Sequence, residues 1–191
     1  ELFAQYAEKY PKSQLTDDAY FNLAMSYKRL DRVEDAKNMY IKLVTDFKGS
    51  ELEERGLMNL GYLLQDVKQY DEAIVYYTRA AELKGKKAAE AGYWIADCLY
   101  SKKQLDKAAA EYMKVYKNHP NDELWAVSAL DAAGRIYESK GNLKSAIDAY
   151  EKIPKVTKNP KYTATAKKKA ELLREQQKLL APEGPVKGGA K

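Results

Sequence analysis

The segment LGYLLQDVKQYDEAIVYY, residues 60–77, decides the fold of this 191-residue chain. It places Gly61 twelve residues before Ala73, and Ala73 four residues before Tyr77. The pair of alanine and tyrosine recurs at steps of 37, 35 and 38 residues, as Ala36 and Tyr40, Ala73 and Tyr77, Ala108 and Tyr112, and Ala146 and Tyr150. Such a period predicts a stacked array in which each unit covers the apolar face of its neighbour.

A second apolar pattern precedes each of these pairs at a fixed offset. Small residues stand twelve positions before the alanines, at Ala24, Gly61, Ala96 and Gly134. Large or apolar residues flank them, at Leu23 and Tyr27, Leu60 and Leu64, Ile95 and Leu99, and Ala133 and Tyr137. A small side chain lets two helices approach closely while its neighbours fill the space on either side. Each unit is therefore predicted to be a pair of helices.

These two patterns resemble the tetratricopeptide repeat (TPR), whose first helix carries a bulky residue, Leu, Gly or Ala, and Tyr, and whose second helix carries Ala followed by Phe or Tyr. The resemblance implies an all-α fold, a right-handed superhelical solenoid of antiparallel helix pairs. The units are slightly longer than the usual TPR, and the first joint reads Tyr-Pro-x-Ser. In these features the chain is similar to the TPRs of bacterial envelope proteins such as the Tol-Pal coordinator and outer-membrane assembly lipoproteins.

The repeat pattern divides the chain into predicted segments. These are residues 1–12 as the second helix of a truncated repeat, 13–48, 49–85, 86–120 and 121–158 as TPR 1 to TPR 4, 159–180 as a capping helix and 181–191 as a disordered tail. Phe3 precedes Pro11 by eight residues, the offset that also separates Tyr112 from Pro120. We therefore expect the chain to be part of a longer TPR protein.

The joints between units predict where helices begin and end. Ser13, Ser50 and Asn121 follow helix-breaking residues, and such side chains accept hydrogen bonds from the first amides of a helix. Ser50 and Glu53 have the spacing of a capping box. Pro154 comes four residues after Tyr150, so the second helix of TPR 4 is expected to be short.

The predicted capping helix is polar, and its apolar residues Ala166, Ala170 and Leu173 follow helical spacing. The net charge of +5 is concentrated in this region, because residues 155–191 hold ten Lys or Arg and three Glu. The cluster at 167–169 suggests an anionic surface as a partner. A solvated face of a capping helix explains the same residues, since no aromatic side chain interleaves them.

Catalytic chemistry finds little support in the sequence. The single histidine, His119, lies in an inter-repeat turn, and the single cysteine, Cys98, lies two residues after Ala96 in a predicted core helix. One His and one Cys do not make an ordinary transition-metal site. Gly85 lacks the flanking pattern of a phosphate-binding loop. We therefore expect no enzyme activity, no metal, no cofactor and no small-molecule substrate.

Partner binding is expected on the concave side, which the TPR resemblance assigns mainly to the first helix of each unit. Positions that flank the packed stripe of these helices form the predicted groove: Phe21, Met25, Arg29, Met58, Asn59, Tyr62, Gln65, Tyr93, Asp97, Tyr100, Asp131 and Arg135. Aromatic and Met side chains would anchor a peptide, and arginines would orient it. The alternative for any one of them, Met58 and Tyr93 in particular, is packing against the neighbouring unit.

The sequence thus predicts a non-catalytic scaffold that binds a protein or peptide, within a bacterial envelope or motility assembly and in the periplasm rather than the cytoplasm. Two alternatives remain at this point. One is an architectural module that associates with copies of itself through repeat ends. The other is binding of an anionic membrane or nucleic acid by the basic C-terminal helix. Nucleic acid is not the expected partner, and a membrane would be reached only through a part outside this chain.

Overall fold

The computed structural model describes residues 2–10, 13 and 15–180 of the chain. Within these residues every regular element is a helix, and there is no strand. The chain divides into two compact units, residues 1–111 and residues 112–191, called here the N-terminal and the C-terminal unit. Each is described by itself. The expected all-α fold of paired helices is confirmed.

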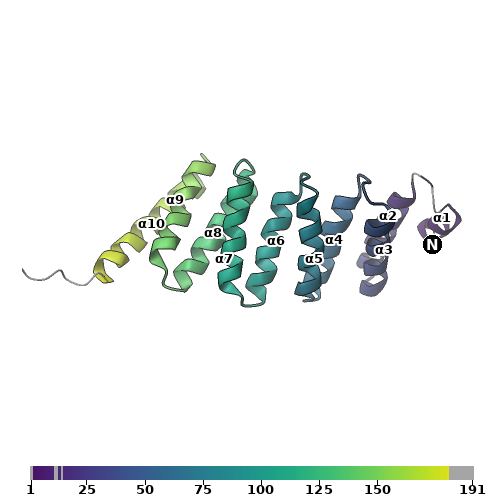
Figure 1. The fold of residues 1–191 in the computed structure, drawn as a ribbon, viewed down its shortest axis with the longest axis horizontal. Coiled ribbons are helices and arrows are strands. Elements are labelled where there is room, and N and C mark those ends of the chain that lie inside the picture. The colour runs from purple at the N-terminus through teal and green to yellow at the C-terminus, as the bar shows by residue number, and fades with distance from the viewer. Residues whose placement is uncertain (1, 11–12, 14, 181–191) are drawn as a thin grey trace, which may run out of the picture. The chain divides into compact units, whose positions relative to one another are not determined.

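The helices of the N-terminal unit alternate in direction along the chain (Figure 1). They are α1 (Leu2–Lys9), α2 (Thr16–Arg29), α3 (Val33–Asp46), α4 (Glu53–Asp66), α5 (Tyr70–Glu82) and α6 (Ala88–Ser101), and α7 (Leu105–Asn118) spans the division between the units. The C-terminal unit continues with α8 (Glu123–Ser139), α9 (Leu143–Val156) and α10 (Pro160–Leu180). The first helices of the four predicted repeats are therefore α2, α4, α6 and α8.

The recurring alanines and tyrosines lie in the core. Ala36, Tyr40, Ala73 and Tyr77 are fully buried, as are Ala146 and Tyr150 in the C-terminal unit. The small residue on the first helix explains how the ring fits. A Cβ atom added to Gly61 would lie 2.4 Å from Cε1 of Tyr77, and one added to Gly134 would lie 2.6 Å from Cε1 of Tyr150. The ring of the second helix thus rests against the backbone of the first.

A left-handed residue ends the first helix of every repeat. Equivalent turns place Asp31, Lys68, Lys103 and Gly141 at φ of 56°, 63°, 62° and 70°. In the second repeat, the backbone amide of Gln69 donates to the carbonyl of Leu64 at 2.8 Å. Equivalent backbone hydrogen bonds of 2.9 Å close the other three turns. This is the Schellman arrangement. Its left-handed position favours glycine, yet only one of the four residues is a glycine.

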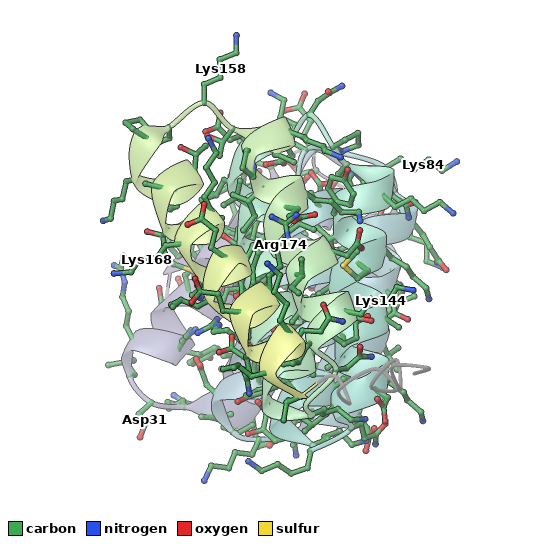
Figure 2. All side chains as sticks on the ribbon, turned by 90° about the vertical axis from the view of Figure 1, so that its left-hand side faces the viewer. Asp31, Lys84, Lys144, Lys158, Lys168 and Arg174 are labelled. Atoms are coloured by element: carbon green, nitrogen blue, oxygen red, sulfur yellow. The ribbon has the colours of Figure 1, made fainter. Side chains whose placement is uncertain are left out.

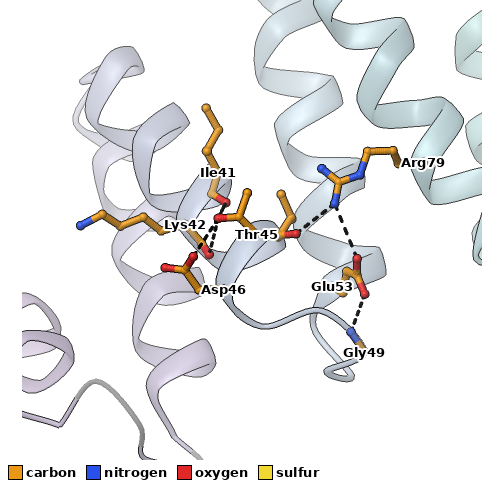
Figure 3. Close-up of polar contacts among 8 residues, drawn as sticks. Ile41, Lys42, Thr45, Asp46, Gly49, Glu53 and Arg79 are labelled. Carbon is orange, nitrogen blue, oxygen red and sulfur yellow. Dashed lines mark hydrogen bonds and ion pairs between the residues drawn. The ribbon is translucent and has the colours of Figure 1, made fainter.

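The turn between α3 and α4 is held by a buried carboxylate (Figure 3). Glu53 is 7% exposed, accepts a hydrogen bond of 2.6 Å from the amide of Gly49, and lies 3.7 Å from the guanidinium of Arg79 on α5. Arg79 also donates to the carbonyl of Val44 at 2.9 Å. Three consecutive helices are therefore joined at one point.

The predicted caps need correction. Glu53 reaches back to Gly49 and not to Ser50, and the Ser50 hydroxyl is buried without a hydrogen-bond partner in the described part of the chain. At the start of α8 the capping side chain is Asp122, which accepts from the amide of Trp125 at 3.4 Å, and not its neighbour Asn121. The backbone conformation of the turn therefore determines which side chain caps the first amides of the helix.

The expectation of a shortened second helix in the fourth repeat is wrong. α9 has 14 residues, as α3 does, and Pro154 lies inside it. Proline removes its own amide donor and crowds the carbonyl four residues before it, here that of Tyr150, and Pro154 stands in the last turn of the helix. Burial of Ile153 and the hydrogen bond from the amide of Thr157 to the carbonyl of Ile153, 3.1 Å, carry the helix past Pro154.

α10 covers α9, as predicted for a capping helix. Ala166, Ala170 and Leu173 are 2%, 3% and 5% exposed and form the buried stripe. Lys169, on an adjacent face, reaches α8 and donates to Asp131 at 2.9 Å. The predicted tail, residues 181–191, lies outside the described residues.

Candidate protein-binding surface

Two of the predicted groove residues lie in the core of the N-terminal unit. Phe21 is 7% exposed and packs edge-on against Tyr40, with ring centroids 6.0 Å apart. Met58 is 2% exposed. Both belong to the same buried cluster as the repeating tyrosines. Neither is available to a partner, so we leave both out of the proposed surface.

The rings of α4 and α6 form a chain of edge-to-face contacts. The centroids of Tyr62 and Trp94 are 5.8 Å apart at an interplanar angle of 85°, and those of Trp94 and Tyr93 are 5.4 Å apart at 90°. All three side chains are half-buried. Such pairs are favourable beyond the area that they bury, and they fix the orientation of each ring. Two first helices thus present one ordered aromatic surface, which we call the aromatic ridge.

Hydrogen bonds between first helices hold this ridge in place. The Tyr62 hydroxyl donates to the carboxylate of Glu90, which also accepts from the ammonium of Lys87 at 2.7 Å. One turn further along, the side-chain amide of Gln65 donates to the carboxylate of Asp97 at 2.8 Å. Burial, followed by the hydrogen bond to Glu90, raises the pKa of Tyr62. These contacts make Tyr62, Gln65 and Asp97 positioning residues between repeats.

Other predicted groove residues remain accessible beside the ridge. Tyr100, at the end of α6, is 47% exposed, and Arg29, at the end of α2, is also exposed. Met25 is half-buried against the core. The side-chain amide of Asn59 donates to the carbonyl of Arg55 one turn before it, at 2.8 Å. The exposed part of the predicted surface therefore combines one ring with polar groups.

Three surface residues were missed by sequence reasoning. Trp94 stands in the ridge, Glu90 binds Tyr62, and Arg55 places its guanidinium over the ring of Phe21 at 4.6 Å from the centroid. Arg55 is exposed and makes no ion pair within the described residues. Arg55 and Glu90 both stand six residues before the small residue of their helix. Aligning the first helices at the repeat period would have found them.

In the C-terminal unit the remaining predicted pair, Asp131 and Arg135, is joined by an ion pair of 3.1 Å along α8. Lys169 of α10 also donates to Asp131. Arg135 keeps 64% of its side chain exposed. A pocket of about 240 Å³ lies nearby, lined by Glu123, Leu124, Val127 and Ser128 of α8 and Tyr162 of α10. None of its residues was predicted.

The remaining features of the described residues concern the cysteine thiol, possible metal ligands and possible membrane-spanning helices. Cys98 is fully buried, and burial raises the pKa of its thiol to about 12, so it stays protonated at neutral pH. The described residues hold no group of three His, Cys, Asp or Glu side chains suited to a metal ion. In the same residues, no helix has the length and apolar character needed to cross a membrane.

Comparison with known proteins gives a consistent result for the fold. Three family models, each described as tetratricopeptide repeat, match residues 18–50, 58–123 and 127–154. No curated protein sequence matches that of this chain.

Several solved structures share the architecture at low sequence identity. YrrB, described as a TPR protein with an unusual peptide-binding site, is 23% identical, with a TM-score of 0.58 over 87% of this chain and 81% of YrrB. MamA is 20% identical, with a TM-score of 0.60 over 93% and 89%. BtubC from P. vanneervenii is 15% identical, with a TM-score of 0.62 over 100% and 77%. At these identities the likeness shows the fold alone.

Proposed function

This chain is built from tetratricopeptide repeats, and we propose that it is a non-catalytic scaffold that binds a segment of a partner protein on the first helices of its N-terminal unit. The proposed surface consists of the aromatic ridge with Tyr100, Arg29 and Arg55. An extended or helical segment would lie along it. Peptide binding by YrrB, a protein of the same fold, supports this kind of function.

The aromatic ridge is the observation that carries the proposal. Half-buried rings on a surface present a large apolar area, and here edge-to-face contacts and the bond from Tyr62 to Glu90 fix them before a partner arrives. A preordered surface loses little conformational entropy on binding. Tyr, Trp and Arg are also the residue types most enriched among those that dominate binding energy.

The two exposed arginines would orient the bound segment. The guanidinium of Arg55 is stacked on Phe21, and its donors make no ion pair within the described residues. An arginine held in this way can donate two parallel hydrogen bonds to a carboxylate. We therefore expect an acidic residue of the partner beside Arg55 and apolar residues over the ridge.

A peptide selected from a random display library on the intact chain tests this proposal. We expect Tyr100→Ala and Arg55→Ala each to weaken its affinity by about tenfold, since loss of one good contact costs roughly 1–2 kcal/mol. Tyr10→Ala is the matched control, because Tyr10 is 46% exposed and Tyr100 is 47% exposed. Isothermal titration would measure the affinities, and circular dichroism would verify folding. Equal affinities for wild type and both variants would exclude this surface.

The setting of this function is a further part of the proposal. We propose a bacterial multiprotein assembly of the envelope, in the periplasm, or of the motility apparatus, in which this chain is part of a longer TPR protein. The longer repeats and the Tyr-Pro-x-Ser joint support this setting. Mass spectrometry of the protein in fractionated source cells would test both its compartment and its length.

Self-association is the alternative that a structural observation favours. Phe3 of α1 and Leu15, just before α2, are 44% and 59% exposed. Exposed apolar side chains of a repeat can stack on another copy. Light scattering at increasing protein concentration would detect such association, and Leu15→Ser should reduce it. A monomer at every concentration would rule the alternative out.

A further inference from the structure

The first helix of the fourth repeat is longer than the others at its N-terminal end. α8 begins at Glu123, eleven residues before Gly134 (134 − 123), whereas α4 begins at Glu53, eight residues before Gly61 (61 − 53). α2 and α6 also begin eight residues before their small residue, at Ala24 and Ala96 (24 − 16 and 96 − 88). The repeat does not require this additional turn, so its side chains are open to another role.

The additional turn is fixed to the start of α10. Asp122 caps it, and the carboxylate of Glu123 accepts a hydrogen bond from the hydroxyl of Thr157, which is 2% exposed. The backbone amide of Asn159 in turn donates to the Thr157 hydroxyl at 3.0 Å. The segment that leads into α10 therefore holds the carboxylate of Glu123 in a defined orientation.

The pocket of about 240 Å³ opens between this turn and α10. Leu124 and Tyr162, 62% and 44% exposed, flank it, and Val127 is 6% exposed. The hydroxyl of Ser128 donates to the carbonyl of Leu124 at 2.7 Å, so its polar atom is engaged by its own helix. Glu123 also lines the pocket, and its carboxylate is engaged by Thr157. The other walls are chiefly apolar, and the pocket is large enough for one partner side chain.

The chain next to this pocket is strongly basic. Residues 155–169 hold six lysines and no acidic residue. Lys169 pairs with Asp131, whereas the five lysines at 155, 158, 161, 167 and 168 make no ion pair within the described residues. Lys158 and Lys168 project outward from the protein (Figure 2). Lys155 and Lys167 line a separate pocket that also contains Glu151 and Glu171. Lys158 and Lys161, which come just before Tyr162 in the chain, therefore carry the charge that attracts acidic groups to the proposed pocket.

We propose that this pocket binds an apolar side chain of a partner segment whose neighbouring residues are acidic. The inference rests on the proposal that the chain binds protein, but it uses a different surface, in the C-terminal unit. The lysines alone would suit any polyanion. The pocket adds a requirement for an apolar anchor between the negative charges, and an acidic peptide supplies both, while a nucleic acid backbone supplies only the charge.

Two synthetic peptides test the inference on the intact chain. Both carry acidic residues on either side of one central residue, which is leucine in the first peptide and glycine in the second. Fluorescence anisotropy should show that the leucine peptide binds about tenfold more tightly, because a buried leucine contributes roughly that much. Its affinity should fall steeply as salt is added.

Variants separate the pocket from the charge. Leu124→Ala should weaken the leucine peptide about fivefold to tenfold and leave the glycine peptide unchanged. Leu172→Ala is the control, because Leu172 is 55% exposed on α10 and does not line the pocket. Equal affinities for the two peptides, failure of the leucine peptide to bind, or an unchanged affinity in Leu124→Ala would overturn the inference. Binding of duplex DNA in preference to the leucine peptide would do the same.

A last comparison keeps the two proposals distinct. Tyr100→Ala should leave the affinity for the acidic leucine peptide unchanged, and Leu124→Ala should leave the affinity for the library-selected peptide unchanged. If Tyr100→Ala weakened the acidic peptide as much as Leu124→Ala does, the pocket would not be a separate site.

Discussion

In two repeats the buried tyrosine hydroxyl of the second helix donates to the side chain twelve positions before it. Where the first helix carries Gly61, the ring of Tyr77 rests on the backbone and its hydroxyl donates to Gln65 at 2.9 Å. Gly134 has the same relation to Tyr150, whose hydroxyl donates to Glu138 at 3.0 Å.

The first repeat has alanine in place of that glycine, and it also lacks an acceptor. Ala24 is the small residue there, and Lys28 occupies the position twelve residues before Tyr40 that Gln65 occupies before Tyr77. A lysine ammonium cannot accept a hydrogen bond. The Tyr40 hydroxyl is fully buried without a hydrogen-bond partner in the described part of the chain.

The two tyrosines should therefore respond differently to loss of the hydroxyl. Tyr77→Phe is expected to lower the free energy of unfolding by about 1 kcal/mol, because it removes a hydrogen bond and leaves Gln65 with one fewer partner. Tyr40→Phe should be neutral or stabilising, because it removes a buried polar atom that has no partner. Urea unfolding would measure both. A larger loss in Tyr40→Phe than in Tyr77→Phe would contradict this explanation.

A double-mutant cycle tests the role of the glycine. Gly61→Ala should destabilise the chain by about 1–3 kcal/mol despite the better helix propensity of alanine, because its Cβ would displace the ring of Tyr77. In that background Tyr77→Phe should cost less than in wild type, since the displaced hydroxyl no longer reaches Gln65. Equal costs in the two backgrounds would show that the glycine does not position the hydroxyl.

At the scale of elements, the left-handed turns are a source of backbone strain. Lys68 and Lys103 adopt φ of 63° and 62°, which costs a residue with a Cβ roughly 1 kcal/mol. Lys68→Gly is therefore expected to raise the free energy of unfolding by about 0.5–1 kcal/mol, as thermal unfolding would show. Lys42→Gly, inside α3, is the control and should lower stability by at least a similar amount, because it also removes the contact of the ammonium with the ring of Tyr20. Destabilisation by Lys68→Gly would contradict the prediction.

The contact of Glu53 with Arg79 joins neighbouring repeats, as Figure 3 shows. Arg79→Ala should lower the free energy of unfolding by about 2 kcal/mol, because it leaves a buried carboxylate without its cation and the carbonyl of Val44 without its donor. The partial exposure of Arg79 keeps this figure below that of a fully buried pair. Urea unfolding would measure this loss, and Arg32→Ala serves as the control variant.

Arg32 forms an exposed ion pair with Asp35 at 2.7 Å. The guanidinium of Arg32 also lies over the ring of Tyr27, 4.5 Å from its centroid. Exposed contacts of these two kinds contribute at most about 1 kcal/mol each, so Arg32→Ala should cost less than Arg79→Ala. If Arg79→Ala were as mild as Arg32→Ala, the buried contact would not be a joint between repeats.

For the whole molecule, the buried tyrosines predict sensitivity to alkaline pH. Burial raises the pKa of Tyr40 to about 12 and also raises the pKa of Tyr77 and Tyr150. In the unfolded chain a tyrosine titrates near pH 10. Below that pH both states keep the proton, and stability is unaffected. Above it the unfolded state binds fewer protons, so stability falls as pH rises toward 12.

Denaturant unfolding at a series of pH values would measure this decline, together with the ultraviolet absorbance of tyrosinate. Tyr77→Phe should reduce the slope between pH 10 and 12, since it removes one group with a raised pKa. Stability that stays constant across this interval would contradict the burial of these hydroxyls.

The sequence was sufficient for the helix pairs and their core, because the packing of Ala73 and Tyr77 against Gly61 repeats with nearly constant spacing. It was not sufficient for the turns. Lys68 and Lys103 adopt a left-handed conformation that favours glycine. The sequence has no glycine at these positions to predict it, because the Schellman hydrogen bonds of the backbone impose the conformation. The continuation of α9 through Pro154 was missed for a similar reason, since burial of Ile153 outweighs the lost donor and the crowding by the proline ring.

The candidate surface was only partly predictable. Helical phase places Phe21 and Met58 beside the packed stripe, but both are buried in the core cluster. Phe21 packs against Tyr40 of its own repeat and lies under Arg55 of the next one, and helical phase alone does not report such contacts. The aromatic ridge has the same origin, because Tyr62 and Trp94 lie on different repeats. The additional turn of α8 leaves no periodic signal at all.

Within each unit the most extensive contacts join helices that are consecutive in the chain, from α1 with α2 to α5 with α6, and from α8 through α9 to α10. Most changes in one repeat are therefore felt by its immediate neighbours. During evolution, the exposed side chains of one first helix can therefore diverge while the rest of the array keeps its stability. A gene that duplicates or loses one repeat can acquire a new partner without first evolving a new fold.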